Sequence, residues 1–362
     1  MEKLIHDYSC ELKGLDFTYN DYSKVKNTGL PLILTLYTKG VCNVKCPSCF
    51  INTFDKKYTE LNLNDYNKII EEAKALGIKT IKISGAGEPL IVKETLEIIK
   101  KAHFLGINVV LYTNGSSIAN SSLSQQKLGF SSNELISFLK KYNVSIVYKF
   151  NSIDDSIQDY MVGVKNYSVN IYAGLFKLIY FGLNKEKRLA IQTIMTPYNY
   201  EKLQEMYKFC REYAIIPYFE TVLKKEKAKK NHDLYLSNKQ IKEIFIELSK
   251  YDKENYNKKW FPIPSFIGFQ CTEIKYGILI NNFGYAQVCP GISKTLGNIK
   301  DSNLYNIWNS DQYKRIRKSI ENLEGKCNTC NFNKEQKCSY GCRAYAYLNT
   351  GKINGEYSEC WY

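Results

Sequence analysis

The stretch Cys42-Asn43-Val44-Lys45-Cys46-Pro47-Ser48-Cys49 places three cysteines within eight residues, in the pattern C-x3-C-x2-C. It directly follows an apolar run, Leu30 to Tyr37, and is therefore predicted to form a loop at the carboxyl end of a first β-strand. A three-thiolate loop can wrap one corner of a [4Fe–4S] cubane and leave one iron open for a substrate or cofactor. Zinc ligation or three unconnected cysteines fit the spacing less well, because zinc sites and ordinary ferredoxins typically use C-x2-C steps.

The composition is typical of a packed globular protein. The 362 residues suit one large domain with a smaller satellite, and 44% of them are hydrophobic. No run approaches 18 uncharged apolar residues, so no membrane span is expected. The N-terminus lacks the apolar core of a signal peptide. Twelve cysteines in such a chain indicate metal ligation in a reducing cytoplasm rather than a disulfide framework.

The net charge of +14 does not by itself indicate a nucleic-acid partner. Lysines are spread over the whole chain, and only one dense run occurs, Lys224 to Lys230. That run is predicted to be a solvated loop, with a docking patch for an acidic partner as the alternative. No nucleic acid is expected among the partners.

The middle of the chain alternates strand-like and helix-like segments, which predicts an α/β fold with a parallel sheet covered by helices. The predicted strands are Leu30–Tyr37, Thr80–Ser84, Asn108–Tyr112, Ser145–Phe150, Ala190–Ile194 and Ile215–Glu220. The predicted helices are Asn64–Leu76, Val92–Leu105, Asn133–Tyr142, Ser168–Phe181 and Tyr200–Tyr213. Residues 116–132 lengthen the loop after the third strand, as a flexible surface insertion or as a lid over a substrate.

The cysteine loop resembles the signature of the radical S-adenosylmethionine (SAM) superfamily. The resemblance implies a partial (β/α)6 TIM-like barrel, with function at the carboxyl ends of the strands. It also implies that SAM binds the open iron and is reductively cleaved to a 5′-deoxyadenosyl radical, which abstracts hydrogen from a substrate. Ser48 stands where the family commonly has an aromatic residue against adenine, so adenine must find its hydrophobic contact elsewhere.

Other SAM contacts are expected at the ends of later strands. Ser84-Gly85-Ala86-Gly87-Glu88-Pro89 resembles the family's Gly-Gly-Glu-Pro element, whose backbone contacts the methionine amino group. The family often has an arginine about a dozen residues after the fourth strand; here Lys149 or Lys165 is the candidate replacement. The expected SAM-site residues are Ser48, Gly85, Gly87, Glu88, Pro89, Thr113, Asn114, Lys149, Asn151, Ser152 and Glu220. No catalytic residue is assigned.

The last hundred residues hold a second cysteine cluster, in the pattern C-x12-G-x4-C, C-x2-C-x7-C-x3-C and a final cysteine. The pattern resembles the SPASM extension, which carries auxiliary [4Fe–4S] clusters. The resemblance implies that Cys327, Cys330, Cys338 and Cys360 ligate an outer cluster. It implies that Cys271, Cys289 and Cys342 ligate an inner one. Together with Cys42, Cys46 and Cys49 these cysteines imply three [4Fe–4S] clusters, and paired structural zinc sites are the alternative.

The inner cluster is predicted to keep an open or non-cysteine site. The stretch from Thr272 to Gly277 lacks the extra cysteine that fully ligated relatives often have. Cys10 and Cys210 remain unassigned, and their sequence contexts do not indicate that folding brings them to this cluster. Cys210 is expected to be a small buried core residue, with a hydrogen-atom donor as the alternative.

The expected domains are an N-terminal extension (1–29), the radical SAM barrel (30–225), a helical linker (226–264) and the SPASM domain (265–362). A peptide or protein side chain is the expected substrate, to be oxidised, cross-linked or epimerised. The alternatives are a small polar metabolite, such as a sugar or cyclitol, and a non-catalytic iron–sulfur or zinc scaffold. Pro290 stands where sulfatase-maturing relatives have an acidic base, which disfavours that activity.

The expected partners follow from the same resemblance. A low-potential electron donor such as flavodoxin or ferredoxin would reduce the cluster. Only 29 residues precede the first strand, too few for a leader-binding module, so a peptide enzyme would use a separate leader-binding protein or a substrate without a leader.

Overall fold

The computed structural model describes residues 10–51, 58–269, 271–335, 338 and 340–362. Its described strands form a nine-stranded sheet in the order β7-β6-β5-β4-β3-β2-β1-β8-β9. The strands are β1 Ile33–Thr38, β2 Thr80–Gly85, β3 Asn108–Thr113, β4 Ser145–Lys149, β5 Leu189–Met195, β6 Ile216–Thr221, β7 Phe266–Ile267, β8 Gly277–Ile280 and β9 Ala286–Gln287.

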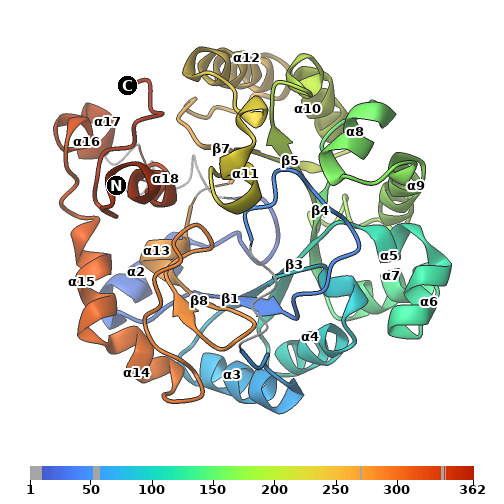
Figure 1. The fold of residues 1–362 in the computed structure, drawn as a ribbon, viewed down its shortest axis with the longest axis horizontal. Helices are drawn as coiled ribbons and strands as arrows, with labels where there is room; N and C mark the ends of the chain where they lie inside the picture. Colours follow the sequence, from blue (N-terminus) through green and yellow to red (C-terminus); the bar gives the residue numbers. More distant parts are fainter. Residues whose placement is uncertain (1–9, 52–57, 270, 336–337, 339) are drawn as a thin grey trace.

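Strands β1 to β6 pair in parallel, each with the next one along the chain. Helices surround the strands in a ring, which gives the outline of a barrel (Figure 1). The helices that connect these strands include α3 Leu63–Ala75, α4 Glu94–Phe104, α7 Ser132–Lys141, α8 Asp155–Val162, α9 Tyr167–Tyr180 and α10 Leu203–Glu212. The six expected strands and the five expected helices are confirmed, with boundaries that move by up to three residues.

The insertion after β3 is helical and packed, so the expectation of a flexible loop is wrong. It forms α5 Ser116–Ala119 and α6 Ser121–Leu128. All of α5 is buried, and Ser132 Oγ donates a hydrogen bond to the carbonyl of Ser117 at 3.1 Å. Burial of a short amphipathic turn outweighs the low helix propensity of its serines.

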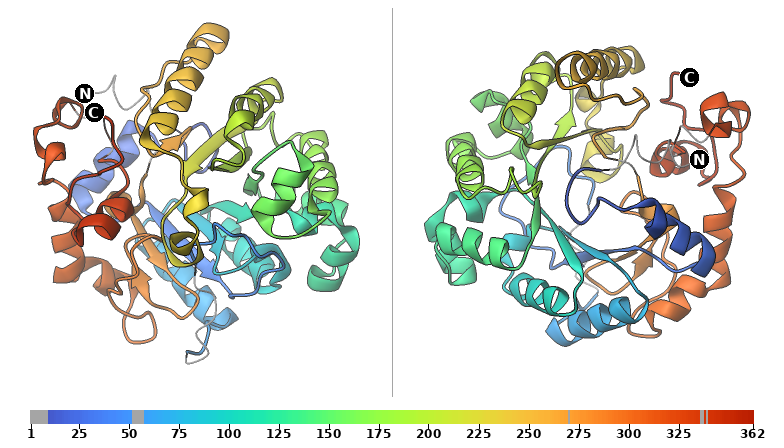
Figure 2. Two further views of the ribbon diagram at one scale, coloured as in Figure 1. Left: turned by 45° about the horizontal axis from the view of Figure 1, so that its top comes forward. Right: turned by 180° about the vertical axis from the view of Figure 1, so that it is seen from behind.

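The N-terminal segment is part of the barrel rather than an appendage. Leu12, Leu15 and Phe17 are buried in one cluster with Val110 of β3 and Val147 of β4. Seen from behind, this segment and α2 (Tyr19–Thr28) lie across the amino ends of the strands (Figure 2). The segment therefore closes the end of the barrel opposite the predicted active site.

The C-terminal region is joined to the barrel sheet at both edges. β7 pairs antiparallel with β6, and β8 pairs in parallel with β1, with Ile33 opposite Gly277. β9 then returns antiparallel to β8. The sheet thus runs on into residues 265–362 instead of ending at a separate domain.

The expected helical linker contains α11 Glu226–Lys230 and the long helix α12 Asn238–Tyr256. The cysteine-rich part adds the helices α13 Glu273–Tyr276, α14 Leu304–Asn309, α15 Asp311–Ser319, α16 Lys326–Thr329, α17 Asn331–Lys334 and α18 Arg343–Thr350. Short 3-10 turns occur at Pro89–Ile91, Tyr200–Lys202 and His232–Leu234. Within the described residues, no helix combines the length and the hydropathy that crossing a membrane requires.

Candidate active site

The cysteine loop follows β1, and three other strand ends hold it in place. Glu88, after β2, donates its backbone N–H to the Val41 carbonyl at 2.7 Å. Asn114, after β3, donates its side-chain amide to Asn43 Oδ1 at 3.0 Å. Lys45 donates its backbone N–H to the carbonyl of Val162, in the segment after β4, at 2.9 Å. The loop therefore lies at the carboxyl ends of the strands, as expected from the sequence.

The three thiols of the loop act on one another electrostatically. Burial raises the pKa of Cys46 to about 11, and the charges of Cys49 and Cys42 add to that rise while Lys149 opposes it. Burial likewise raises the pKa of Cys42, with Glu88 and Cys49 contributing. Such a set binds a cation strongly, because a positive metal centre removes the cost of three neighbouring thiolates.

The glycines of the second loop allow backbone to touch backbone. A Cβ at Gly87 would lie 1.9 Å from the carbonyl oxygen of Val41, and one at Gly85 would lie 1.7 Å from that of Gly87. Only glycine fits such positions. The Gly85–Glu88 segment is therefore fitted against the cysteine loop, where the resemblance places the amino group of SAM.

Glu88 itself ties two strand ends together. Its buried carboxylate accepts hydrogen bonds from Thr113 Oγ1 and the Asn114 N–H, both at 2.6 Å, and from the Leu90 N–H at 2.9 Å. Burial raises its pKa, and these donors oppose the rise. The side chains of Glu88 and Thr113 are thus used within the protein, and Pro89 is buried at the start of a 3-10 turn.

Of the two candidate lysines, Lys149 is the one that faces the site. Its charge acts on Cys42, Cys46, Glu88 and Glu220. Lys165 is exposed on the loop after α8.

Asn151 and Ser152 are buried and hold the loop that follows β4. Asn151 Oδ1 accepts the N–H of Ile194 at 3.0 Å, and Ser152 Oγ accepts the N–H of Asp154 at 3.0 Å. Ser48 is half-buried in the turn before Cys49, which donates its N–H to the Cys46 carbonyl at 3.2 Å. These residues lie at the predicted end of the barrel, but Asn151 and Ser152 already bind neighbouring backbone.

Glu220 lies near the carboxyl end of β6 in a partly buried network. Its carboxylate accepts hydrogen bonds from Gln192 Nε2 at 2.6 Å and from the Tyr218 hydroxyl at 2.9 Å. Burial raises the pKa of Glu220, opposed by the charge of Lys149 and by both hydrogen bonds. A carboxyl group in such surroundings holds a proton more readily than a solvent-exposed one.

Buried polar atoms without a partner mark the same end of the barrel. In the part of the chain that the structure describes, Thr38 Oγ1, Gln192 Oε1 and Thr221 Oγ1 have no hydrogen-bond partner. Thr38 and Thr221 are the last residues of β1 and β6, and Gln192 lies in the middle of β5. Buried polar groups normally find partners, so these atoms fit a polar ligand such as SAM at this end of the barrel.

The C-terminal cysteines fall into two electrostatic groups. In the first, Cys342 and Cys271 both contribute to the rise in the pKa of Cys289, which burial dominates. Burial also raises the pKa of Cys342 to about 12, with Cys271 adding to it. These three cysteines are the set expected to hold the inner cluster.

The second group contains the remaining four. Burial raises the pKa of Cys338 to about 11, and Cys360 contributes. Burial also raises the pKa of Cys360, with contributions from Cys327 and Cys330. Cys327 Sγ accepts the N–H of Tyr357 at 3.4 Å, a type of bond that stabilises a ligating thiolate. These four cysteines are the set expected to hold the outer cluster.

Over the described residues, no three His, Cys, Asp or Glu side chains are held at the spacing of a single metal ion. A cubane separates its thiolates more widely than a single ion does, because each thiolate binds a different iron. The donor chemistry, all thiol and in sets of three and four, fits iron–sulfur clusters.

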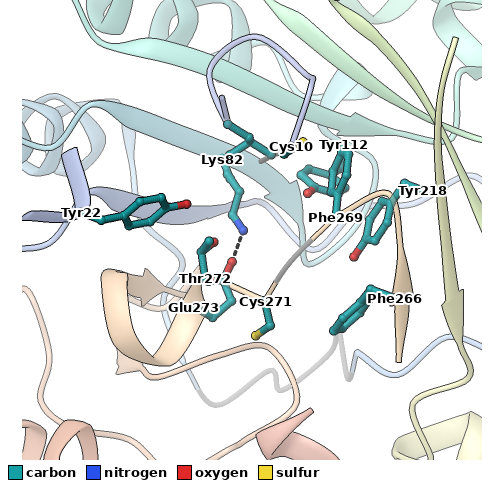
Figure 3. A pocket seen from close by; sticks show the side chains of 11 residues that line it. Cys10, Tyr22, Lys82, Tyr112, Tyr218, Phe266, Phe269, Cys271, Thr272 and Glu273 are labelled. Atoms are coloured by element: carbon teal, nitrogen blue, oxygen red, sulfur yellow. Dashed lines mark hydrogen bonds and ion pairs between the residues drawn. The ribbon is translucent and has the colours of Figure 1, made fainter. Parts of the chain in front are cut away.

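A pocket opens between the barrel and the C-terminal region (Figure 3). Aromatic residues form much of its wall, and the rings of Tyr218 and Phe269 stack at 4.1 Å. Lys82 of β2 forms an ion pair with Glu273, which also accepts a hydrogen bond from Thr35 Oγ1 at 3.0 Å. The pocket therefore offers aromatic surface and one charged pair beside Cys271.

Cys10 also lines this pocket, which the sequence did not suggest. The N-terminal segment crosses the end of the barrel and so brings Cys10 toward the C-terminal region. Figure 3 shows Cys10 and Cys271 at opposite ends of the Lys82–Glu273 pair. Cys210 lies in α10 and is fully buried among apolar residues, as expected.

Two family models match successive parts of the chain. The Radical SAM superfamily model matches residues 36–210, and an iron–sulfur cluster-binding domain model, SPASM, matches residues 271–331. The chain belongs to the radical SAM superfamily. The members of this family bind SAM and a [4Fe–4S] cluster, and the SPASM domain adds auxiliary clusters.

Among curated relatives, a probable GTP 3′,8-cyclase of Methanothermobacter marburgensis is 27% identical over 188 residues, which is 51% of this chain and 56% of the cyclase. The chain thus spans little more than half the length of that relative. An AdoMet-dependent heme synthase of Methanosarcina barkeri is 22% identical over 92% of this chain and 97% of the synthase.

Solved structures of radical SAM proteins share the fold over most of the chain. SuiB of Streptococcus suis bound to its precursor peptide SuiA has a TM-score of 0.67 and 19% identity, covering 94% of this chain and 79% of SuiB. Native anSMEcpe with bound AdoMet has a TM-score of 0.66 and 15% identity, covering 91% of this chain and 94% of anSMEcpe.

Sequence reasoning missed the pocket residues Lys82 and Tyr218. Both lie inside predicted strands, and the only signal was a lysine in the otherwise apolar run Thr80–Ser84. A charged residue in a strand that is covered on both faces usually points into a cavity or site.

Proposed function

We propose that this protein is an enzyme that reductively cleaves SAM and uses the resulting 5′-deoxyadenosyl radical to abstract hydrogen from a peptide or protein side chain. One observation supports the proposed cleavage of SAM. The cysteine loop, the Gly85–Glu88 segment and Lys149 lie together at one end of the barrel. The cluster, when bound, supplies the electron that cleaves the sulfonium bond. The chain's own residues bind SAM and orient it there.

Cys42, Cys46 and Cys49 would hold the cluster, while the backbone of Gly85 to Glu88 would receive the methionine end of SAM. Lys149 would replace the family's arginine beside the SAM carboxylate, since its charge acts on this site. Thr38, Gln192 and Thr221 would satisfy their free polar atoms on SAM or on the substrate. Glu220, linked to Tyr218 at the pocket, would accept a proton from the substrate.

A peptide substrate is supported by the fold neighbours, since SuiB and anSMEcpe have both been crystallised with peptides. A small-molecule substrate is the second candidate, because curated relatives are named for a nucleotide, a GTP or a heme reaction.

The SAM chemistry is tested with the triple variant C42A/C46A/C49A. Reduced wild-type enzyme with SAM should release 5′-deoxyadenosine, and the triple variant should release none. The variant should keep its auxiliary iron, because those ligands lie in residues 271–360. Undiminished release from the variant would refute the assignment of the catalytic cluster.

The substrate class is tested by fractionating an extract of the source organism. The yield of 5′-deoxyadenosine should rise with a peptide fraction and lose that stimulation after protease treatment. Stimulation by the small-molecule fraction alone would favour the alternative. A low-potential flavodoxin or ferredoxin is the proposed electron donor, and a separate leader-binding protein would be needed only if stimulation required a second protein.

We also propose an open iron at the inner auxiliary site, facing the pocket beside Cys271. The Cys10→Ala variant tests this proposal, since Cys10 is the one unassigned thiol that lines the pocket. Iron content of about 12 per chain and an unchanged inner-cluster spectrum are expected in C10A by the ligand count. Cys210→Ala, a buried thiol away from the pocket, is the matched control. A changed inner-cluster spectrum in C10A alone would identify Cys10 as the fourth ligand.

A further inference from the structure

Arg343 is a buried cation with free hydrogen-bond donors. It follows Cys342 directly and is the first residue of α18, and only 2% of its surface is exposed. Its Nη1 donates to the Gly355 carbonyl at 2.7 Å and, more weakly, to that of Ile353 at 3.5 Å. Its Nε and Nη2 find no partner among the described residues. The guanidinium is therefore hydrogen-bonded through Nη1, while the N–H donors of Nε and Nη2 have no acceptor among the described residues.

Such an arrangement is costly unless an anion lies beside it. A buried charge is normally paired, and a buried N–H without an acceptor destabilises the fold. Arg211 shows the usual solution, because it donates two hydrogen bonds to the carboxylate of Asp252. No acidic residue in the described ranges forms an ion pair with Arg343.

Arg343 is placed close to ligands of both auxiliary sets. It follows Cys342 of the inner set directly, and the segment 353–357 that accepts its hydrogen bonds also donates the Tyr357 N–H to Sγ of Cys327 in the outer set.

The charge of Arg343 acts on Cys342 and Cys271, assigned to the inner site, and on Cys338, assigned to the outer site. In each case burial is the largest influence and raises the pKa of the thiol, and Arg343 opposes it. The guanidinium is thus within electrostatic reach of both sets of ligands.

We propose that Arg343 donates N–H···S hydrogen bonds to the thiolate and sulfide sulfurs of the two auxiliary clusters and raises the reduction potential of both. The inference rests on the proposed assignment of the seven C-terminal cysteines to iron–sulfur clusters. A cluster held by thiolates is anionic, so it would provide the negative charge that no acidic side chain of the described residues provides for Arg343. Hydrogen bonds to sulfur and nearby positive charge both stabilise the reduced, more negative state.

Arg343 is accordingly a positioning residue that acts through the ligands. Because one side chain reaches ligands of both sites, it would set the two potentials together and favour electron transfer between the sites. The N-terminal end of α18 adds donors at the same place, since Cys342 is the residue before its first turn.

The test is a redox titration of the reconstituted holoenzyme followed by electron paramagnetic resonance. Arg343→Met removes the charge and every donor, and both auxiliary potentials should fall. Arg343→Lys keeps the charge but loses the planar fork, so its potentials should lie between those of R343M and wild type. Repeating the titration in the C42A/C46A/C49A background isolates the auxiliary signals, and the potential of the SAM-binding cluster in R343M alone should stay unchanged.

Arg317→Met is the matched control. Arg317 is also a partly buried arginine of the C-terminal region, but it stacks on Trp308 at 3.8 Å and donates to the Trp308 carbonyl. R317M should leave both auxiliary potentials unchanged.

Auxiliary potentials equal to wild type in R343M, with full iron content, would overturn the proposal. If the reduction potential changes at only one auxiliary cluster, Arg343 does not act on both clusters, and the proposal of a shared role is wrong. If R343M loses auxiliary iron, R343K decides, because unchanged potentials with full iron there would refute the N–H···S bonds. Zinc in place of auxiliary iron in the wild type would instead refute the underlying cluster assignment, so the two failures are distinguishable.

Discussion

Residues at the carboxyl ends of the strands contribute to the site in two ways, by close backbone packing and by polar contacts. Glycines such as Gly87 allow backbone segments to meet, and buried polar groups such as Glu88 and Glu220 connect or face the site. The two kinds of contact respond differently to substitution, because the first fails through steric overlap and the second through unpaired donors or charge.

We predict that Gly87→Ala displaces the cysteine loop. The new Cβ would overlap the Val41 carbonyl, which is backbone and cannot move without the loop. The variant should lose iron from the SAM-binding cluster and bind SAM at least tenfold more weakly, as about 1.4 kcal/mol implies. Gly129→Ala is the control for the steric overlap: no atom lies within 4 Å of its added Cβ, and only its left-handed backbone, with a φ of +80°, opposes the alanine. Equal iron content in the two variants would contradict the prediction.

We predict that Glu220→Gln changes how stability depends on pH. Burial raises the pKa of Glu220 above the ordinary value of 4.5, so the fold favours its protonated form. The stability that the carboxyl group contributes is present below pH 4.5 and is lost as the pH rises through the raised pKa. The melting temperature of E220Q minus that of wild type should therefore increase between pH 4.5 and 7. If the melting-temperature difference stays constant over this range, the hydrogen bonds and Lys149 offset the cost of burying the charged carboxylate, and the prediction is wrong.

At the scale of elements, one polar cluster fastens α12 to the barrel helix α10. Asp252 of α12 is fully buried and accepts hydrogen bonds from the Tyr207 hydroxyl at 2.6 Å, from Arg211 and from Trp260 Nε1 at 2.9 Å. The long helix of the predicted linker is therefore held by a specific network as well as by apolar contacts.

We predict that Asp252→Ala destabilises the protein by about 3–5 kcal/mol, because it leaves the buried Arg211 without its counter-charge. The control is Glu254→Gln on the same helix, whose ion pair with Lys250 is exposed and spans 3.9 Å. Such a pair contributes about 0–1 kcal/mol. Urea denaturation of the two variants, followed by intrinsic fluorescence, measures the difference. Similar urea midpoints would mean that the buried network adds nothing beyond packing.

At the scale of the molecule, barrel and cysteine-rich region share one sheet. All six residues of β1 are buried, and its second edge is covered by β8, which lies more than 230 residues later in the chain. An edge strand this apolar would pair with another molecule if it were uncovered.

We therefore predict that a barrel ending at residue 264 aggregates even when its cysteine loop is intact. Light scattering and the soluble yield measure this outcome. The control is the full chain with Cys327, Cys330 and Cys338 replaced by alanine, which loses ligands of the outer site but keeps β8. The control should be more soluble than the truncated barrel. A monodisperse barrel without residues 265–362 would show that β8 is dispensable.

The sequence by itself determined the strands, the helices and the place of the C-x3-C-x2-C loop after the first strand; the membership of the auxiliary cysteine sets came from the resemblance and stays a prediction. Period-2 and period-3.6 apolar patterns are local, and ligand spacing within a loop is set by a few backbone bonds, so both survive in the sequence. The expected positions of Gly85 and Gly87 rested on the same kind of local pattern.

Only the tertiary structure decided which distant groups meet. Cys10 reaches the pocket because the N-terminal segment crosses the barrel, and the charge of Arg343 acts on cysteines of both auxiliary sets. β8 joins β1 although no local pattern selects that strand as its partner. Burial and electrostatic pairing depend on distances through space. For residues far apart in the chain, only the packed core fixes these distances.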